Sequence, residues 1–501
     1  MYTDSEEKVG VQLDPNGSFH CNSVNIDQAN KDLCSVDVIE VADEIYIDPE
    51  DEARVVRKLD WNVLPILCLF YFLAALDRNN LGNAGPAGFT KALNMTQPQF
   101  SNAISFFFIT YIIFELPGTL LLRIIKPSRL LTIGVVGWSL VCLGVTFVKS
   151  YEALLACRLL MGAFESFFFP CLSVLISSII YKRDEMPIRM AIILSMAAFS
   201  GCVGGLISYG FLQINTPVLA GFRFIFLFEA LLTIVVSPII IFWLPDDLTK
   251  AKFFNEKERK IMILREKQRE KFMGNPKFEW KEVFAAFKEP RTYFGFIIQF
   301  CQDLILYGGS TFFPSILKLG LGFEKLQAQY LTIPPYVVSG ISVIVFSYYS
   351  DKLNLRAPFI IGTNFVGIVG YIILLTVHND WVKYFALFLV SVPLYVGPGI
   401  NIAWTGNNFA PYYRRTTAIG MNQTIGNLSG VVSGQVYRKS PYILGHAFSL
   451  GCLVVSNICV VLNVWRLKYL QREKDIIISE GTIDTRSKRT GDYSLDFNYC
   501  Y

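Results

Sequence analysis

Long apolar runs alternate with short polar segments over most of this chain. A helix needs about 20 apolar residues to cross the roughly 30 Å hydrocarbon core of a bilayer. On that criterion the pattern predicts twelve transmembrane helices in two six-helix halves, on either side of one long polar stretch. The first six are expected near 61–81, 99–121, 128–148, 151–180, 187–213 and 222–244, and the others near 292–317, 327–349, 357–377, 381–405, 416–437 and 445–466. The predicted fold class is an all-α membrane protein.

The polar segments divide the chain into five parts. We expect a disordered N-terminal tail (1–53), a first half (54–244), a linker (245–291), a second half (292–466) and a C-terminal tail (467–501). Charges of both signs alternate at helical spacing along the linker sequence FNEKERKIMILREKQREKF, which is typical of a solvated helix. Lys and Arg favour the segments on the linker side, which predicts that both termini and the linker are cytoplasmic.

Composition narrows the class of protein further. Hydrophobic residues make up 52% of the chain and charged residues 17%, where soluble domains carry about 25% charged residues. The net charge of +4 is modest and indicates no nucleic-acid partner. The eleven cysteines form no CxxC pair, and no nucleotide-binding loop or HExxH sequence is present. We therefore expect no enzyme activity, no metal and no cofactor.

Charged residues inside the apolar runs are the candidate functional groups. A charge within a bilayer costs at least a few kcal/mol, so it persists mainly where it pairs, faces a cavity or carries function. The predicted spans hold five carboxylates and two arginines: Asp77, Glu115, Glu165, Glu229, Asp303, Arg78 and Arg158. Of the three histidines, His20 lies in the tail and His378 and His446 are assigned to outside loops, His446 at the edge of the last span. A proton carrier within the membrane is therefore expected to be a carboxylate.

Two pairs of these charged residues suggest a common site. Arg158 and Glu165 are two helical turns apart, about 10.5 Å along one face, and Gly162 between them would let a neighbouring helix approach. Asp77 and Arg78 lie in the outer half of the first span, at a depth similar to that of Arg158. The interpretation is that the two arginines bind an anion while Asp77 and Glu165 take up protons. A static network of buried salt bridges is the alternative.

Four further residues are weaker candidates for substrate binding. Asp303 and Tyr307 are one helical turn apart in the seventh span, where they would line the site or join two helices by a hydrogen bond. Asn401 and Gln423 belong to a group of amides in the tenth and eleventh spans. Amides there can hold a polar substrate or bond neighbouring helices.

Several sequence runs then carry a family resemblance. They are LDRNNLGNA (76–84), RLLMGAFESFFFP (158–170), FRFIFLFEAL (222–231), LTIPPYVVSG (331–340), SDKLNLRAPFI (350–360) and QTIGNLSGVVSGQVYR (423–438). In this order they resemble the anion:cation symporters of the major facilitator superfamily. The similarity is greater to the fungal allantoate and vitamin permeases, and among these to the nicotinic acid permeases of yeasts.

The resemblance implies a role for each of the four central charges. Asp77 and Glu165 match the acids that handle protons, Arg78 matches the arginine that contacts the anion, and Arg158 matches the arginine that holds the network. The implied function is a multi-pass, monomeric symporter of the plasma membrane that imports nicotinate with protons. Allantoate, ureidosuccinate, pantothenate, biotin, cysteine or a sulfonate are alternative substrates. A non-transporting nutrient sensor is a further alternative, although such proteins normally need a longer cytoplasmic extension.

Overall fold

The computed structural model describes residues 40–41, 44–45, 47–121, 125–182, 185–214, 220–273, 280–410, 412–480, 492, 495 and 497–501. The chain forms two compact units, Met1–Asp48 and Pro49–Tyr501. In the first unit, strands β1 (Glu40–Val41) and β2 (Glu44–Ile45) form a short antiparallel pair. Most of the disordered tail expected at residues 1–53 lies outside the described residues.

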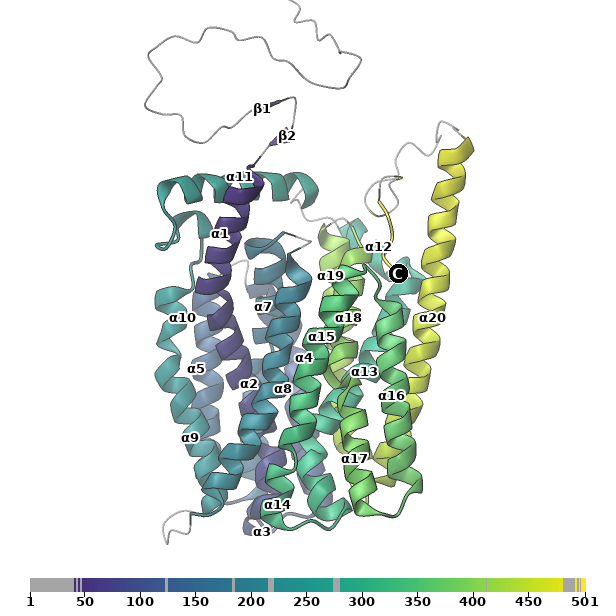
Figure 1. Ribbon diagram of the computed structural model, residues 1–501. Coiled ribbons are helices and arrows are strands. Elements are labelled where there is room, and N and C mark those ends of the chain that lie inside the picture. Colours follow the sequence, from purple (N-terminus) through teal and green to yellow (C-terminus); the bar gives the residue numbers. More distant parts are fainter. Residues whose placement is uncertain are drawn as a thin grey trace, which may run out of the picture. The chain divides into compact units, whose positions relative to one another are not determined.

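The second unit is a bundle of helices that run between two ends of the molecule (Figure 1). Its first half contains α1 (Pro49–Asn62), α2 (Leu64–Ala84), η2 (Gly85–Phe89), α3 (Thr90–Ala92), α4 (Gln97–Leu120), α5 (Pro127–Thr146), α6 (Tyr151–Glu165), α7 (Phe168–Val174), η4 (Leu175–Ile180), α8 (Met186–Phe211), α9 (Gly221–Val236) and α10 (Pro238–Trp243). The linker contains η5 (Leu248–Lys250), α11 (Glu256–Met273) and α12 (Trp280–Lys288).

The second half repeats this arrangement with its own set of long helices. They are α13 (Pro290–Ser315), η6 (Ile316–Gly320), α14 (Lys325–Tyr330), α15 (Ile333–Lys352), α16 (Ala357–Thr376), α17 (Asp380–Ser391), α18 (Pro393–Asn408), α19 (Tyr412–Val436) and α20 (Ile443–Glu480). Several helices begin at residues suited to that position. Pro290 and Pro393 occupy first turns, where a missing N–H costs little, and Asn379 accepts hydrogen bonds from the first amides of α17.

Nine helical segments of the described chain are long and apolar enough to cross a membrane. Helices α4, α13 and α19, which correspond to three of the expected spans, are not among them. Polar side chains such as Gln299 and Asp303 in α13 and Asn422 and Gln423 in α19 lower the apolar content of those two helices. Three of the candidate site residues lie on these two helices, Asp303 and Tyr307 on α13 and Gln423 on α19.

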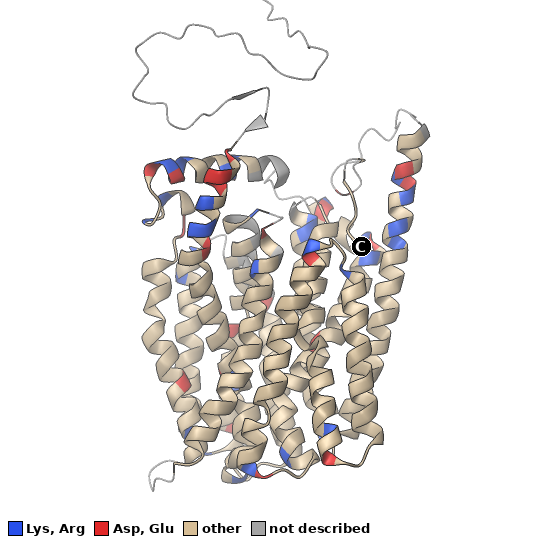
Figure 2. Cartoon of the chain, in the orientation of Figure 1, with Lys and Arg blue, Asp and Glu red and all other residues tan. Residues whose placement is uncertain are grey.

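The outer surface of the bundle is apolar. Val235, Phe242 and Trp465 are 74%, 78% and 67% exposed, and many other large apolar side chains point outward between them. An apolar surface of this extent is unfavourable in water but is compatible with lipid chains. Charged residues instead gather at the end of the bundle that carries α1, α11 and α12 (Figure 2).

The linker helix α11 is tied to the first half and is not simply solvated as its charge pattern suggests. Arg265 is only 4% exposed and forms ion pairs with Glu52 of α1 and with Glu185 at the start of α8. Lys58 of α1 donates to Glu258 at 2.7 Å. Burial raises the pKa of Glu258, but its hydrogen bonds with Lys58 and with the backbone amide of Asn255 outweigh this and hold the pKa below its ordinary value.

The expected C-terminal tail is partly helical and partly docked. Helix α20 continues to Glu480, and Asp492, which is fully buried, forms ion pairs with Arg291 of α13 and Arg414 of α19. The backbone carbonyl of Cys500 accepts hydrogen bonds from Trp404 and Asn408 at the end of α18, both at 2.9 Å. The described residues near the end of the chain therefore pack against the linker-side end of the second half.

Asp492→Asn should lower the stability of the purified protein. The substitution removes the carboxylate that two buried arginines share. Breaking a buried ion pair by removing one partner costs about 3–5 kcal/mol, and the loss here should be smaller because Arg291 keeps Glu289 at 3.5 Å and Arg414 keeps Glu282 at 3.2 Å. The melting temperature in detergent should fall by several degrees. Asp475→Asn is the matched control because Asp475 is exposed on α20, and it should melt like the unsubstituted protein. Equal melting temperatures for the two variants would contradict this account of the docked segment.

Candidate functional site

A small cavity lies between the two halves, near the middle of the bundle. Its volume is about 50 Å³, several times the roughly 10–15 Å³ that one water molecule needs. It is lined by Tyr71, Ala75, Arg78, Asn79, Tyr111, Phe169, Leu194, Ala197, Gln299, Asp303, Leu306, Tyr307, Ser310, Tyr395, Pro398, Ile402, Gln423 and Asn427. Four of the sequence-predicted residues therefore meet at one cavity: Arg78, Asp303, Tyr307 and Gln423.

One face of α2 supplies the first wall of this cavity. Tyr71, Ala75, Arg78 and Asn79 follow the i, i+4, i+7, i+8 spacing of residues that share a helix face. Arg78 donates from Nε to a carboxylate oxygen of Glu165 at 2.8 Å, and its Nη2 contacts the same oxygen. The Arg78 guanidinium also lies over the ring of Tyr111, 5.3 Å from its centroid. Arg78 therefore connects the cavity to a buried acid on α6.

Glu165 is fully buried behind Arg78. Its Oε1 accepts both contacts from Arg78, whereas its Oε2 has no hydrogen-bond partner among the described residues. Glu165 itself does not line the cavity. The pair thus has one carboxylate oxygen that is bound and one that is available for a proton.

Asp77 points away from the cavity, into the interior of the first half. It is fully buried and accepts hydrogen bonds from Trp138 of α5 at 3.0 Å and from Thr233 of α9 at 3.5 Å, and its other oxygen contacts the Cys142 thiol at 3.6 Å. In the described part of the chain it forms no salt bridge. Asp77 and Arg78 are therefore neighbours in sequence but face opposite environments.

Arg158 does not face the cavity either. It is 3% exposed, its Nη1 contacts the Met161 sulfur at 3.8 Å, and no described carboxylate lies within 4.0 Å of it. The expectation that Arg158 and Arg78 form one anion site is therefore not met in this conformation. The expected close approach at Gly162 is confirmed, because a Cβ atom there would lie 2.2 Å from the Phe107 carbonyl of α4.

The second half contributes polar side chains from α13 and α19. Asp303 accepts from the Gln299 amide at 3.1 and 3.0 Å, and Tyr307 donates to Asn427 at 2.6 Å. Gln423 lines the cavity, and its Oε1 has no hydrogen-bond partner among the described residues. Gln423 is therefore an amide of the cavity wall that is available to a ligand.

Asn401 joins two helices and does not line the cavity. Its amide donates to the Gly295 carbonyl at 3.1 Å and to Gln299 at 2.8 Å, which joins α18 to α13. It is absent from the cavity lining, so the alternative of bonding between helices holds for this residue.

Sequence reasoning identified Tyr307 but missed the other four aromatic residues of the cavity. Tyr71, Tyr111, Phe169 and Tyr395 line it, but the chain has 24 tyrosines and 41 phenylalanines, so aromatic identity alone selects none of them. One signal was present for Tyr71, which lies two helical turns before Arg78 and therefore on the same face. No local pattern distinguishes the other three.

Close packing joins the halves at the end opposite α11. A Cβ atom at Gly82 of α2 would lie 2.3 Å from the Thr311 carbonyl of α13. A second contact between the halves joins α4 to α19, where Ser105 donates to the Val431 carbonyl at 2.9 Å. Gln329 of α14 donates to the Asn83 carbonyl at 3.1 Å. These contacts hold the two halves together on that side.

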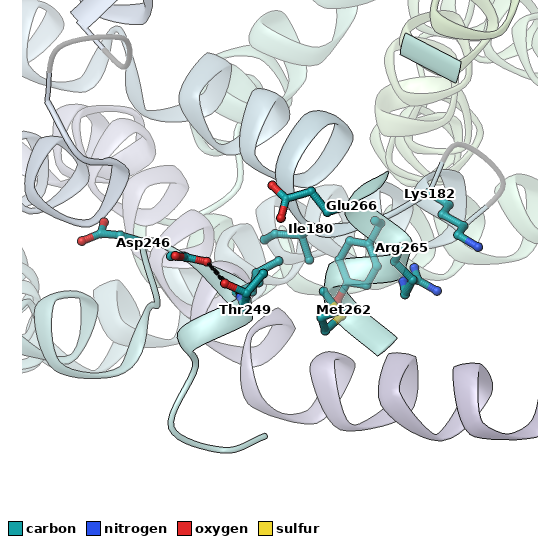
Figure 3. A pocket seen from close by; sticks show the side chains of 10 residues that line it. Ile180, Lys182, Asp246, Thr249, Met262, Arg265 and Glu266 are labelled. Carbon is teal, nitrogen blue, oxygen red and sulfur yellow. Dashed lines mark hydrogen bonds between the residues drawn. The ribbon is translucent and has the colours of Figure 1, made fainter. Parts of the chain in front are cut away.

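A larger cavity lies at the charged end of the first half (Figure 3). It measures about 260 Å³ and is lined by residues of η4, η5 and α11 together with Tyr181, Lys182, Asp246 and Asp247. Its charged groups already have protein partners: Arg265 pairs with Glu52 and Glu185, and Asp247 accepts from Thr249 at 2.6 Å. It is separate from the buried charges of the bundle, so we place the functional site in the smaller, central cavity. The described residues contain no group of three or more potential metal ligands.

Two facing halves with a polar cavity between them are typical of membrane transporters that work by alternating access. Residues 67–434 match the family model of the Major Facilitator Superfamily, and the chain belongs to that family. It is a multi-pass membrane protein and a secondary transporter, not an enzyme.

Relatives place it among fungal transporters. It is 45% identical to an uncharacterised transporter of Schizosaccharomyces pombe, over 93% of this chain and 97% of the relative. It is 33% identical to the high-affinity nicotinic acid transporter of Saccharomyces cerevisiae, over 90% and 85% of the two chains. Among solved structures it is similar to a bacterial homologue of the human lysosomal transporter Spinster, in an inward-facing and occupied conformation. The TM-score is 0.59 at 14% identity, covering 80% of this chain and 96% of the other.

Proposed function

We propose that this protein is a proton-coupled symporter of the plasma membrane that imports a small organic anion, and that this anion is nicotinate. The observation that carries the proposal is the position of Arg78. Its guanidinium lies on the cavity wall and is bound to a single buried carboxylate, Glu165. A substrate carboxylate can take the place of that acid, and a guanidinium–carboxylate contact is strong where water is excluded.

Coupling follows from competition for Arg78. When Glu165 is ionised, it holds Arg78, and a second anion at the same guanidinium would add a negative charge to a site of low dielectric. When Glu165 gains a proton on Oε2, its hold on Arg78 weakens and the guanidinium becomes available to the substrate. Anion and proton therefore enter together, and their joint binding biases the equilibrium between the outward and inward states.

The rest of the cavity supports a flat, aromatic carboxylate. Tyr71, Tyr111 and Tyr395 supply ring faces, and Gln423 and Asn79 supply polar groups. Nicotinate combines a carboxylate with a planar ring that carries one further hydrogen-bond acceptor. The 33% identical relative named as a nicotinic acid transporter supports the same substrate.

We further propose twelve transmembrane helices in a monomer with both termini in the cytoplasm. The nine apolar segments are completed by helices α4, α13 and α19, which lie among them in the bundle. Charged residues gather at the end with α1 and α11 (Figure 2), which fits a cytoplasmic face.

A competition assay tests the substrate. Cells that lack their own permease would express the chain and take up labelled nicotinate in the presence of an excess of unlabelled compounds. Nicotinate should suppress uptake, whereas nicotinamide, which has no carboxylate, should not. Suppression by allantoate, pantothenate, biotin, cysteine or a sulfonate at lower concentration than by nicotinate would reassign the substrate within the same transport class.

Glu165→Gln should uncouple transport from protons. The amide cannot carry the proton and cannot hold Arg78 as an ion pair, so uptake should no longer rise in acid or fall with an uncoupler. Uptake would be measured at two pH values in cells with matched amounts of surface protein. Glu152→Gln, on the exposed face of the same helix, is the control and should keep the normal pH response. An unchanged response in Glu165→Gln would remove this residue from the coupling mechanism.

A further inference from the structure

A second buried acid lies behind the cavity, in the interior of the first half. Glu229 of α9 is fully buried, and α9 packs against α5 and α2. Asp77 lies within electrostatic range of it, and Thr233, one turn further along α9, donates to Asp77. Cys142 of α5 contacts Asp77 and lies within electrostatic range of Glu229 as well. The two acids thus belong to one polar cluster.

The two acids of this cluster differ in their hydrogen bonds. Asp77 receives contacts from Trp138, Cys142 and Thr233, which suit an ionised carboxylate. Neither carboxyl oxygen of Glu229 has a hydrogen-bond partner among the described residues. An ionised carboxylate that is fully buried without donors is strongly disfavoured. Glu229 therefore carries a proton in this conformation.

The charges that face Glu229 come from few elements. On α2, Asp77 lies within electrostatic range of it, whereas Arg78 turns to the cavity and pairs with Glu165. On α5, Cys142 is a titratable group within electrostatic range of it. Arg158 of α6 lies within electrostatic range of Asp77 and Cys142. With Asp77 ionised and Arg158 charged, the cluster is neutral only while Glu229 keeps its proton.

The remaining neighbours of α9 add no charge at this point. Arg223 of α9 donates to the carbonyls of Thr146 and Val148, at 2.6 and 3.0 Å. Arg189, the only charged residue of α8, pairs with Asp60. On α8 the titratable Cys202 contacts the Ile333 carbonyl and Tyr209 packs on Tyr330, while η2 and α10 carry no titratable residue.

We propose that Glu229 is a second proton-carrying residue of the transport cycle, with Asp77 as its partner. Two carboxylates within electrostatic range in a dry interior do not both ionise readily, so one of the two carries a proton. In this conformation the proton is on Glu229. When it moves, the O–H bond at Glu229 breaks and one forms at Asp77, directly beside Arg78 in the sequence. This inference rests on the proposed proton symport and adds a group that does not touch the substrate.

The test compares proton-driven accumulation with exchange, using purified protein in liposomes and labelled nicotinate. Glu229→Gln keeps the size of the side chain and its neutral state but cannot release a proton. We expect it to lose accumulation above the external concentration under an inward proton gradient. Exchange of internal for external nicotinate, which needs no net proton movement, should continue. Accumulation by Glu229→Gln equal to that of the unsubstituted protein would overturn the proposal, as would loss of exchange in correctly inserted protein.

Two further measurements distinguish failure of this proposal from failure of the proposed symport and from failure of the variant to insert. If the unsubstituted protein shows no proton-driven accumulation, the proposed symport fails, and that result is distinct from normal coupling in Glu229→Gln alone. If Glu229→Gln does not insert into membranes, Glu229→Asp is measured in its place. The shorter acid should shift the pH dependence of accumulation, and an unchanged pH profile would contradict a proton-carrying role.

Discussion

Arg78→Lys should abolish most uptake although it keeps the positive charge. Arg78 uses both Nε and Nη2 on Glu165, and its flat guanidinium also lies over the Tyr111 ring. A lysine ammonium is a point charge that offers neither the paired donors nor the stacking plane. We expect uptake to fall by at least about tenfold, the equivalent of one charge-assisted hydrogen bond of roughly 1.5–3 kcal/mol. Uptake of labelled nicotinate by equal amounts of surface protein is the measurement.

Arg223→Lys is the matched control for this substitution. Arg223 lies in the same half, and its guanidinium binds the backbone carbonyls of Thr146 and Val148 rather than an acid at the cavity. Its replacement should leave substrate affinity unchanged. Near-normal transport by Arg78→Lys would remove Arg78 from the role of carboxylate ligand and leave the cavity without an assigned anion-binding group.

Gly82→Val should prevent the halves from closing at the end opposite α11. The Cβ atom would lie 2.3 Å from the Thr311 carbonyl, and backbone atoms cannot move aside as a flexible side chain can. Helices α2 and α13 would have to separate, which favours states that are open on this side. Because transport needs both states, uptake should fall by about tenfold or more if closure is disfavoured by roughly 1.4 kcal/mol or more.

The open state can be measured directly. Ser310→Cys places a thiol on the cavity wall, and a membrane-impermeant thiol reagent added outside cells should label it faster when Gly82→Val is also present. Each variant without Ser310→Cys gives the background from the native cysteines. Gly210→Val is the matched control because a Cβ atom at Gly210 has no neighbour within 4 Å. Equal labelling rates in the Gly82→Val and Gly210→Val backgrounds would show that the contact at Gly82 does not close the transporter.

The helical architecture could be predicted because apolar runs of membrane length are a local property of the sequence. The all-α fold was expected and is confirmed. Helix α6 shows where local reasoning stops. The spacing of Arg158 and Glu165 places both on one face, but spacing does not say what that face meets. In the structure it packs on α4 at Gly162, and only Glu165 reaches Arg78.

The candidate site shows the same limit of local reasoning at Asp77 and Arg78. Consecutive residues on a helix point about 100° apart, so Asp77 and Arg78 cannot share a direction. Which of them faces the cavity depends on the stripe formed with Tyr71 and Ala75, and on the donors that α5 and α9 present to Asp77. The second condition depends on contacts between residues far apart in the sequence.

The docked C-terminal segment could not be predicted for the same reason. Asp492 lies in a polar region that reads as a tail, and its partners, Arg291 and Arg414, are distant in the sequence. The linker helix is similar, because alternating charge indicates a solvated helix unless complementary charges such as Glu52 and Glu185 lie opposite it.

The most direct test of proton-coupled anion import is uptake of labelled nicotinate by cells that lack their own permease and express this chain. Uptake would be measured at acidic and at neutral external pH, each with and without an uncoupler, after surface expression has been verified. The account predicts uptake that is faster in acid and collapses with the uncoupler. Absence of nicotinate uptake by protein at the cell surface would reject nicotinate as the substrate, and uptake that ignores both pH and the uncoupler would contradict proton symport.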